Sequence, residues 1–154
     1  MVVNEMEVCM VWLRNVTKDD YSLELDVNEE QHQFVASYKS ILDYAFDEQG
    51  NEQMYAYIVC DEDIAVGVME YSDCFEIMAY NLCYLFIDRR YQGKGYGLKA
   101  VQLLLEKLRQ EKKFDKVSVT LFDGNDSARK LYEKVGFAPN GYVFEDEYDM
   151  EMSI

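Results

Sequence analysis

Three glycines at alternate positions, Gly93, Gly95 and Gly97, separate an apolar run from a segment with helical periodicity. The run 84–87 predicts the end of a strand, and the apolar residues of 98–108 predict a helix. Because glycine has no Cβ, main-chain N–H groups at such a junction can converge on one ligand. The free N–H groups and the dipole at the start of a helix favour an anion. This spacing therefore predicts a cradle for a pyrophosphate.

The spacing differs from two common phosphate loops. A dinucleotide fingerprint needs G-x-G-x-x-G, and a triphosphate loop needs G-x-x-x-x-G-K followed by Ser or Thr. Here Lys94 lies inside the loop, and neither hydroxyl residue follows it. The run 92–97, Q-G-K-G-Y-G, instead resembles the Q/R-x-x-G-x-G/A loop of the GNAT superfamily of N-acetyltransferases, which binds the pyrophosphate of acetyl-coenzyme A. For a glycine loop considered alone, the alternative is a turn that binds nothing.

A second motif lies downstream. Residues 125–137, N-D-S-A-R-K-L-Y-E-K-V-G-F, resemble the N-x-x-A-x-x-L-Y-x-K-x-G-F signature of the same superfamily. The signature follows a strand-like stretch, 116–122, and opens a helix, as it does in that family. The two motifs in this order imply a GNAT-like α/β fold, with a mixed central β-sheet of about seven strands flanked by about four helices. We expect residues 1–154 to form a single domain.

The resemblance implies coenzyme contacts in both motifs and in the strand before the glycines. Backbone groups of that strand would pair with the pantetheine arm, and backbone amides of the loop would hold the pyrophosphate. Asn125 would contact the arm, while Lys94 and Arg129 would face the nucleotide phosphates. The set implied for acetyl-CoA, bound as a co-substrate, is Leu85, Phe86, Ile87, Gln92, Gly93, Lys94, Gly95, Tyr96, Gly97, Leu98, Asn125 and Arg129.

The resemblance implies one catalytic residue, Tyr132, as the proton donor to the departing sulfur. The alternative for this tyrosine is a core position on an amphipathic helix, and for Asn125 it is a helix N-cap. The general base is left unassigned. Many family members carry a carboxylate on the strand before the glycine loop, but 81–86 contains none. Glu70 on the neighbouring strand, Asp88 beside the loop and a water chain remain as alternatives.

The acceptor is predicted from a narrower resemblance. Segments 25–46 and 87–97 resemble the corresponding parts of the bacterial spermine/spermidine acetyltransferases. A polyamine needs carboxylates spaced along a groove and aromatic rings beside its methylenes. The candidates for substrate binding are Glu29, Glu30, Glu70, Asp73, Glu76, Tyr80 and Tyr84. Asn81 and Tyr84 stand where close relatives tend to carry Trp and Arg, a departure that bears on the choice of polyamine.

We therefore expect an acetyl-CoA-dependent N-acetyltransferase that acetylates a small cationic amine, a polyamine such as spermidine or spermine, by direct attack in a ternary complex. Two alternatives stay open. The acceptor could be an aminoglycoside, an amino acid or a protein amine, or the domain could hold acetyl-CoA without turnover.

The charge balance agrees with a cationic partner. Acidic residues number 30 and basic residues 15, a formal charge of −15, and such a field concentrates ligands of the opposite sign; solubility alone is the alternative. The same balance disfavours nucleic acid. No apolar run has the length of a membrane span, and the acidic start is unlike a secretory signal. Four cysteines without C-x-x-C spacing and a single histidine predict reduced thiols, no metal site and a cytoplasmic protein.

The remaining elements must position these residues. Apolar alternation predicts strands over 8–16, 53–60, 64–71, 76–87 and 116–122, and a closing pair from 136–137 and 142–154. Helices are predicted to begin at Thr17, at Leu98 and at Asn125, and over 28–46 as one interrupted helix or two short ones. Turns are expected at 47–51, at 61–63, at 72–75 and around Pro139. An exposed closing hairpin makes a homodimer an expectation.

Overall fold

The computed structural model describes residues 10–47, 50 and 53–154, and in this part of the chain seven strands form one sheet. The strands are β1 (Val11–Asn15), β2 (Met54–Asp61), β3 (Ile64–Cys74), β4 (Ala79–Ile87), β5 (Lys116–Phe122), β6 (Ala138–Phe144) and β7 (Glu147–Ser153). The helices are α1 (Tyr38–Ala45), α2 (Tyr96–Glu111) and α3 (Asp126–Val135), with 3-10 turns η2 (Lys18–Ser22) and η3 (Glu29–Gln31).

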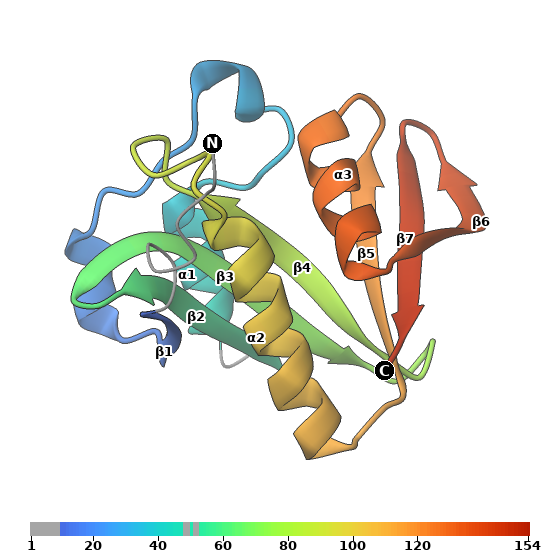
Figure 1. Cartoon of the computed structure of the whole chain (residues 1–154). Helices are drawn as coiled ribbons and strands as arrows, with labels where there is room; N and C mark the ends of the chain where they lie inside the picture. Colours follow the sequence, from blue (N-terminus) through green and yellow to red (C-terminus); the bar gives the residue numbers. More distant parts are fainter. Residues whose placement is uncertain (1–9, 48–49, 51–52) are drawn as a thin grey trace.

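The sheet is mixed, with the order β1-β2-β3-β4-β5-β7-β6 (Figure 1). Neighbouring strands are antiparallel except β4 and β5, which run parallel because α2 crosses over between them. The α/β fold with a mixed central sheet of seven strands is confirmed. The expected helix count is wrong by one, since the described residues form three α-helices and not four.

Helices cover both faces of the sheet, with α2 and α3 on one face and α1 on the other (Figure 1). On α2, Val101, Leu104 and Leu108 recur at helical spacing and are fully buried in the larger core. On α1, Ile41 and Leu42 are fully buried in a second, smaller core. The sheet therefore separates two hydrophobic clusters.

The segment before β2 is less helical than expected. The helix predicted from Thr17 is a single 3-10 turn, closed by a hydrogen bond of 2.7 Å from the Thr17 N–H to Asp20 Oδ2. The segment 28–46 divides into η3 and α1, and Phe34 lies in the turn between them. The Phe34 side chain contacts Phe122 at the end of β5, with ring centroids 6.5 Å apart.

Two predicted turns are wrong. Ser72 and Asp73, which look like turn residues, continue β3 by pairing with Asn81 and Tyr80, so the turn falls at 75–78. Asp73 tolerates this position because an ion pair with Lys113 compensates its charge. Pro139 lies in β6, the last strand of the sheet, where a missing N–H costs no ladder hydrogen bond on the open side.

Some predictions fall partly outside the described residues. The first strand, expected over 8–16, is described only from Val11, and the loop 47–51 only at residues 47 and 50. Within the described residues, Cys60, Cys74 and Cys83 form no disulfide, and Cys9 lies outside the described residues. Within the described part of the chain, no helix combines the length and the apolar composition needed to cross a bilayer.

Candidate active site

β4 and β5 separate at a β-bulge. They pair only from Tyr80 to Leu82, against 117–119. On the other side of β4, Leu82 pairs with Tyr71 and Tyr84 pairs with Glu70, so the register of β3 and β4 shifts by one residue at Cys83. A bulge bends its strand and ends pairing. Figure 1 shows β4 and β5 diverging, which leaves the β5-facing backbone groups of the end of β4 without a strand partner.

A cavity of about 460 Å³ lies at this divergence. Its walls come from the end of β4, the glycine loop, the start of α2, one face of α3 and the segment between η3 and α1. The predicted site residues on its lining are Leu85, Phe86, Ile87, Gln92, Gly93, Gly95, Tyr96, Gly97, Leu98, Asn125 and Tyr132. The topology thus brings both sequence motifs to one cavity.

The glycine loop has the backbone conformation that the sequence predicts for an anion cradle. Gly93 and Gly95 have φ values of +77° and +89°, which favour glycine. A Cβ built at Gly93 would meet nothing within 4 Å, so backbone conformation and not space requires the glycine there. Gly95 is the N-cap of α2, and the first N–H groups of this helix lie on the cavity lining without intrahelical acceptors.

Asp88 fixes the start of this loop. Its carboxylate accepts hydrogen bonds from the Asp26 N–H at 2.9 Å and from Arg90 Nε at 2.8 Å. Burial by itself would raise the pKa of Asp88, but these donors outweigh it and hold the pKa below its ordinary value. The buried carboxylate is therefore ionised and already satisfied, which argues for a structural role and against a general base.

Gln92 ties the loop to two other elements. Its Nε2 donates to the Ile87 carbonyl at 2.9 Å and to Gln31 Oε1 at 3.0 Å. The glycine loop is thereby joined to the end of β4 and to η3 before any ligand arrives.

α3 supplies Asn125 and Tyr132. Asn125 is the N-cap of the helix, since its side chain accepts from the Ala128 N–H. Tyr132 is buried, packs edge to face on Phe137 with ring centroids 5.3 Å apart, and lines the cavity. Burial raises the pKa of Tyr132 far above its ordinary value. Its hydroxyl therefore keeps its proton at neutral pH.

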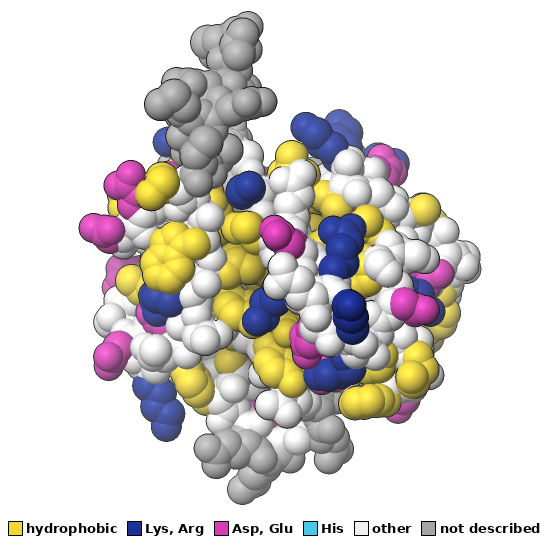
Figure 2. All heavy atoms as spheres, turned by 60° about the horizontal axis from the view of Figure 1, so that its bottom comes forward, with side chains coloured by type: hydrophobic (Ala, Val, Ile, Leu, Met, Phe, Trp, Pro, Cys, Tyr) yellow, Lys and Arg dark blue, Asp and Glu magenta, His cyan; other side chains and the backbone are white. Residues whose placement is uncertain are grey.

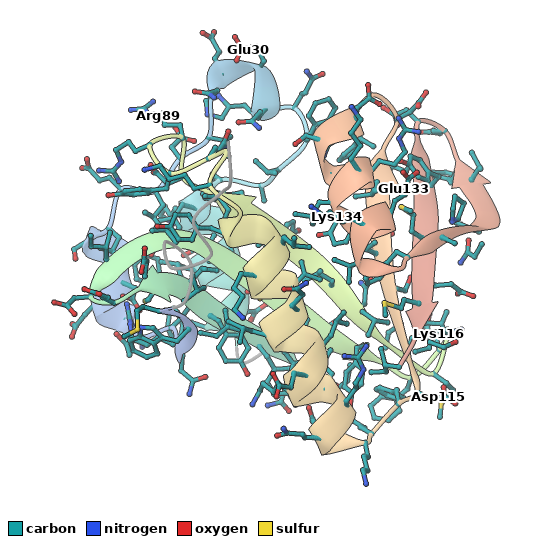
Figure 3. All side chains as sticks on the ribbon, viewed as in Figure 1. Glu30, Arg89, Asp115, Lys116, Glu133 and Lys134 are labelled. Atoms are coloured by element: carbon teal, nitrogen blue, oxygen red, sulfur yellow. The ribbon has the colours of Figure 1, made fainter. Side chains whose placement is uncertain are left out.

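The lining includes two cations to which the sequence analysis gave no role, Lys130 and Lys134. They lie four residues apart and so share one face of α3; Figure 3 shows Lys134 extending from α3 toward α2. Lys94 and Arg129, the cations expected to face the nucleotide phosphates, are absent from the lining. Arg129 instead pairs with Asp126 at 3.3 Å. The signal that could have found the two lysines is the lysine of the second motif, Lys134, with Lys130 one helical turn before it.

The acidic candidates for acceptor binding lie apart. Glu29 and Glu30 are exposed on η3, and Glu30 points outward from it (Figure 3). Glu76 is exposed in the turn 75–78, at the end of β4 opposite the cavity. The structure therefore does not bring these three carboxylates together.

Asp73 and Tyr80 also lie near that opposite end, in a structural cluster. Asp73 Oδ2 is 2.6 Å from Lys113 Nζ and accepts a hydrogen bond from the Tyr55 hydroxyl. The buried Tyr80 hydroxyl accepts from the Lys113 N–H at 3.0 Å. Glu70 and Tyr84 differ from these two, because they pair with each other beside the pair of Val68 with Phe86, which lines the cavity.

The surface is not uniformly acidic. On the face that Figure 2 turns forward, Lys and Arg side chains lie among hydrophobic ones. A second hollow, lined by Arg109, Lys112, Lys113 and Phe114 among others, lies where α2 ends. Across the residues described, no group of three or more His, Cys, Asp or Glu is arranged to hold a metal ion.

A mixed sheet that opens at a bulge beside a glycine loop defines the class of the protein, and comparison with known families agrees. Residues 14–137 match the Acetyltransferase (GNAT) family, and the chain belongs to this family.

Relatives and solved structures are consistent with that assignment. A spermine/spermidine N(1)-acetyltransferase of Bacillus subtilis (strain 168) is 41% identical over 56 residues, 36% of this chain and 37% of that protein. An uncharacterized N-acetyltransferase, SPbeta prophage-derived YokL of the same strain, is 28% identical over 98 residues, 63% of this chain and 55% of that protein. The chain thus matches little more than a third of the first relative and about half of the second.

Among solved structures, the spermidine N-acetyltransferase of Vibrio cholerae in complex with CoA and spermine superposes with a TM-score of 0.76. The two share 17% identity, and the match covers 94% of this chain and 95% of that one. A domain from Methanocaldococcus jannaschii DSM 2661 gives a TM-score of 0.75 at 18% identity, over 94% of this chain and 98% of that one. At such identities the likeness shows a shared fold.

Proposed function

We propose that this protein is an acetyl-CoA-dependent N-acetyltransferase whose acceptor is a small cationic amine, with a polyamine such as spermidine or spermine as the favoured acceptor. The observation that carries the proposal is the single cavity at which the open edge of β4, the glycine loop and Tyr132 meet. The free cysteines support a reducing, cytoplasmic setting.

The cavity fits coenzyme A in three respects. The end of β4 offers backbone N–H and C=O groups that can pair with amide groups of an extended arm, as an added strand would. The loop from Gln92 to Leu98 offers N–H groups to a pyrophosphate. Lys130 and Lys134 offer positive charge to further phosphates. When bound, acetyl-CoA would supply an acetyl thioester at the β4 edge.

The chain's own groups then have defined tasks. An N–H on the open edge of β4 faces the carbonyl oxygen and stabilises the negative charge that develops there. Tyr132, neutral because its pKa is raised, donates its proton to the departing sulfur. The cavity walls hold the two reactants together and exclude water.

The polyamine is favoured by two observations. One is the likeness to proteins named for spermidine and spermine, and the other is the net charge of −15. Since the acceptor candidates among the surface acids lie apart, the acceptor class rests on these two observations and not on a preformed acidic groove.

The test is release of free thiol from acetyl-CoA by the purified chain, against spermidine, spermine, aminoglycosides and amino acids. We expect release with the polyamines, and mass spectrometry should show an added acetyl group. Release with another amine alone would overturn the polyamine assignment and keep the reaction. If no amine causes thiol release while calorimetry still shows that acetyl-CoA binds, the result would favour a coenzyme-binding module without turnover.

A further inference from the structure

Glu70 is a buried carboxyl that the structure leaves unpaired. Its side chain on β3 is completely inaccessible to solvent, and neither Oε1 nor Oε2 has a hydrogen-bond partner among the described residues. An ionised carboxylate in such surroundings is costly, and buried carboxyls are normally paired. Burial, with no opposing charge, raises the pKa of Glu70 to about 8. No contribution of Glu70 to packing explains why a carboxyl stands there.

No charged group among the described residues contributes to the pKa shift of Glu70, which burial alone causes. Its cross-strand partners are Ala56 on β2 and Tyr84 on β4. The Tyr84 ring stacks on Tyr44 of α1, with centroids 5.8 Å apart and an interplanar angle of 7°. Burial raises the pKa of Tyr84, and the charges of Tyr44, Cys83 and Glu70 add to the rise, so these four titratable groups lie near one another. Tyr84 is half-buried and Tyr44 is exposed.

Glu70 also adjoins the cavity. Val68 pairs with Phe86, which lines the cavity, and Glu70 with Tyr84 is the next pair on the same face of the sheet. Diagonal neighbours of this kind lie about 7–8 Å apart. Beyond Tyr84, β4 bulges at Cys83 and parts from β5, so Glu70 lies beside the opening of the sheet.

Building on the acetyltransferase proposed above, we propose that Glu70 is the counter-charge and proton acceptor for the acceptor amine. The amine reaches it past the Tyr44–Tyr84 stack, whose rings can cover a methylene chain and contact an ammonium group. This assigns a specific task to the unpaired carboxyl and to the aromatic pair that covers it.

The proton balance is simple. The ammonium nitrogen gives one proton to a Glu70 oxygen and becomes a nucleophile. Its lone pair forms the new C–N bond to the acetyl carbon as the C–S bond breaks, and Tyr132 protonates the sulfur. The nitrogen loses a second proton as the amide forms, which restores Tyr132, and Glu70 releases the first proton to solvent. One proton is released overall for each ammonium that is acetylated.

Binding alone has a consequence that can be measured. Near pH 7 the carboxyl of the free protein holds a proton, because its pKa is about 8. Before binding, the Glu70 carboxyl and the ammonium group each hold an acidic proton. In the complex the carboxylate and the ammonium group share one of these two protons, and the other is released. Nearly one proton should therefore leave for each amine bound, and the affinity for the amine should rise with pH up to about 8.

The experiment titrates spermidine into the protein holding coenzyme A, by calorimetry in two buffers of different ionisation enthalpy. The wild-type chain should release nearly one proton more than Glu70→Gln at about pH 7. Glu70→Gln should also lower kcat/KM for spermidine at least about 100-fold, as loss of a base does. Its KM for acetyl-CoA should stay unchanged. Glu76→Gln, exposed at the opposite end of β4, is the matched control.

The outcomes separate this proposal from the one on which it rests. If the wild-type chain acetylates spermidine and Glu70→Gln retains both the wild-type kcat/KM and the wild-type proton release, the role of Glu70 is wrong and the enzyme stands. If the wild-type chain acetylates no amine, the proposed acetyltransferase function is wrong, and the role proposed for Glu70 is wrong with it. If the wild-type chain releases no proton when spermidine binds, the role of Glu70 is likewise wrong, and that outcome does not depend on how well Glu70→Gln folds.

Discussion

Gln31 on η3 and Gln92 in the glycine loop meet side chain to side chain, with Gln92 Nε2 donating to Gln31 Oε1 across 3.0 Å. The same Gln31 oxygen accepts from the Asn28 N–H at 3.2 Å. The segment 25–46, from which the acceptor was predicted, is thereby joined to the glycine loop, which is expected to bind the coenzyme.

We expect Gln31→Ala to loosen the glycine loop. Losing a hydrogen bond of this kind costs about 0.5–1.5 kcal/mol, so KM for acetyl-CoA should rise about 3- to 10-fold with kcat nearly unchanged. Steady-state kinetics measures both. Gln33→Ala is the control, because the Gln33 side chain bonds only within its own turn, to the Glu30 carbonyl. Equal effects of the two substitutions would contradict the role of the Gln31–Gln92 contact.

Tyr132→Phe keeps the packing on Phe137 and removes only the hydroxyl. If that hydroxyl protonates the sulfur, kcat should fall about 100-fold while the affinity for acetyl-CoA holds. Thiol-release kinetics and calorimetry measure the two quantities. Tyr142→Phe, on the exposed face of β6, should leave both unchanged. If Tyr132→Phe turns over at the wild-type rate, the hydroxyl is not the proton donor and Tyr132 serves only in core packing.

Gly93 and Gly141 offer a matched pair. Both have positive φ, +77° and +91°, and a Cβ at either would meet nothing within 4 Å. Gly93→Ala and Gly141→Ala should therefore lose similar stability, about 1–2 kcal/mol each. Only Gly93→Ala should weaken binding of acetyl-CoA, because only Gly93 lines the cavity. Thermal unfolding and calorimetry separate the two effects, and weakened binding in both variants would contradict the cradle.

Stability should depend on pH through Glu70. Its pKa in the folded chain, about 8, lies above the ordinary 4.5, so its contribution is complete below about pH 4.5 and is lost as pH rises through 8. Glu70→Gln removes this dependence, and the melting temperature of the variant relative to wild type should increase by several degrees between about pH 5 and pH 8. Parallel curves would show that Glu70 is not held neutral. Glu76→Gln should follow the wild-type curve.

β6 leaves an apolar strand edge exposed, since Tyr142, Val143 and Phe144 are 58%, 68% and 58% accessible. Uncovered edges of this kind pair with other chains, and we expect a homodimer formed through β6. Sedimentation velocity should show a dimer for the wild-type chain and a monomer for Val143→Asp. A wild-type monomer, or a dimer that survives the substitution, would contradict this interface.

Local signals in the sequence were sufficient for much of the site. The glycine spacing and the apolar period of 98–108 predicted the loop and α2, because both depend on neighbouring residues. Asp73 was misread as a turn residue because its partner, Lys113, lies 40 positions away. Lys130 and Lys134 were given no role because a motif specifies residue types and does not say which face of a helix lines a cavity.

The joint between β4 and β5 consists of three residue pairs, and it connects the N-terminal strands to the C-terminal ones. A ligand that contacts the strands on both sides of this joint holds them together. At a concentration 100 times its dissociation constant, such a ligand adds about 2.7 kcal/mol to the stability of the folded chain. We therefore expect bound acetyl-CoA to make opening of residues 116–153 rarer and to protect this segment from proteases.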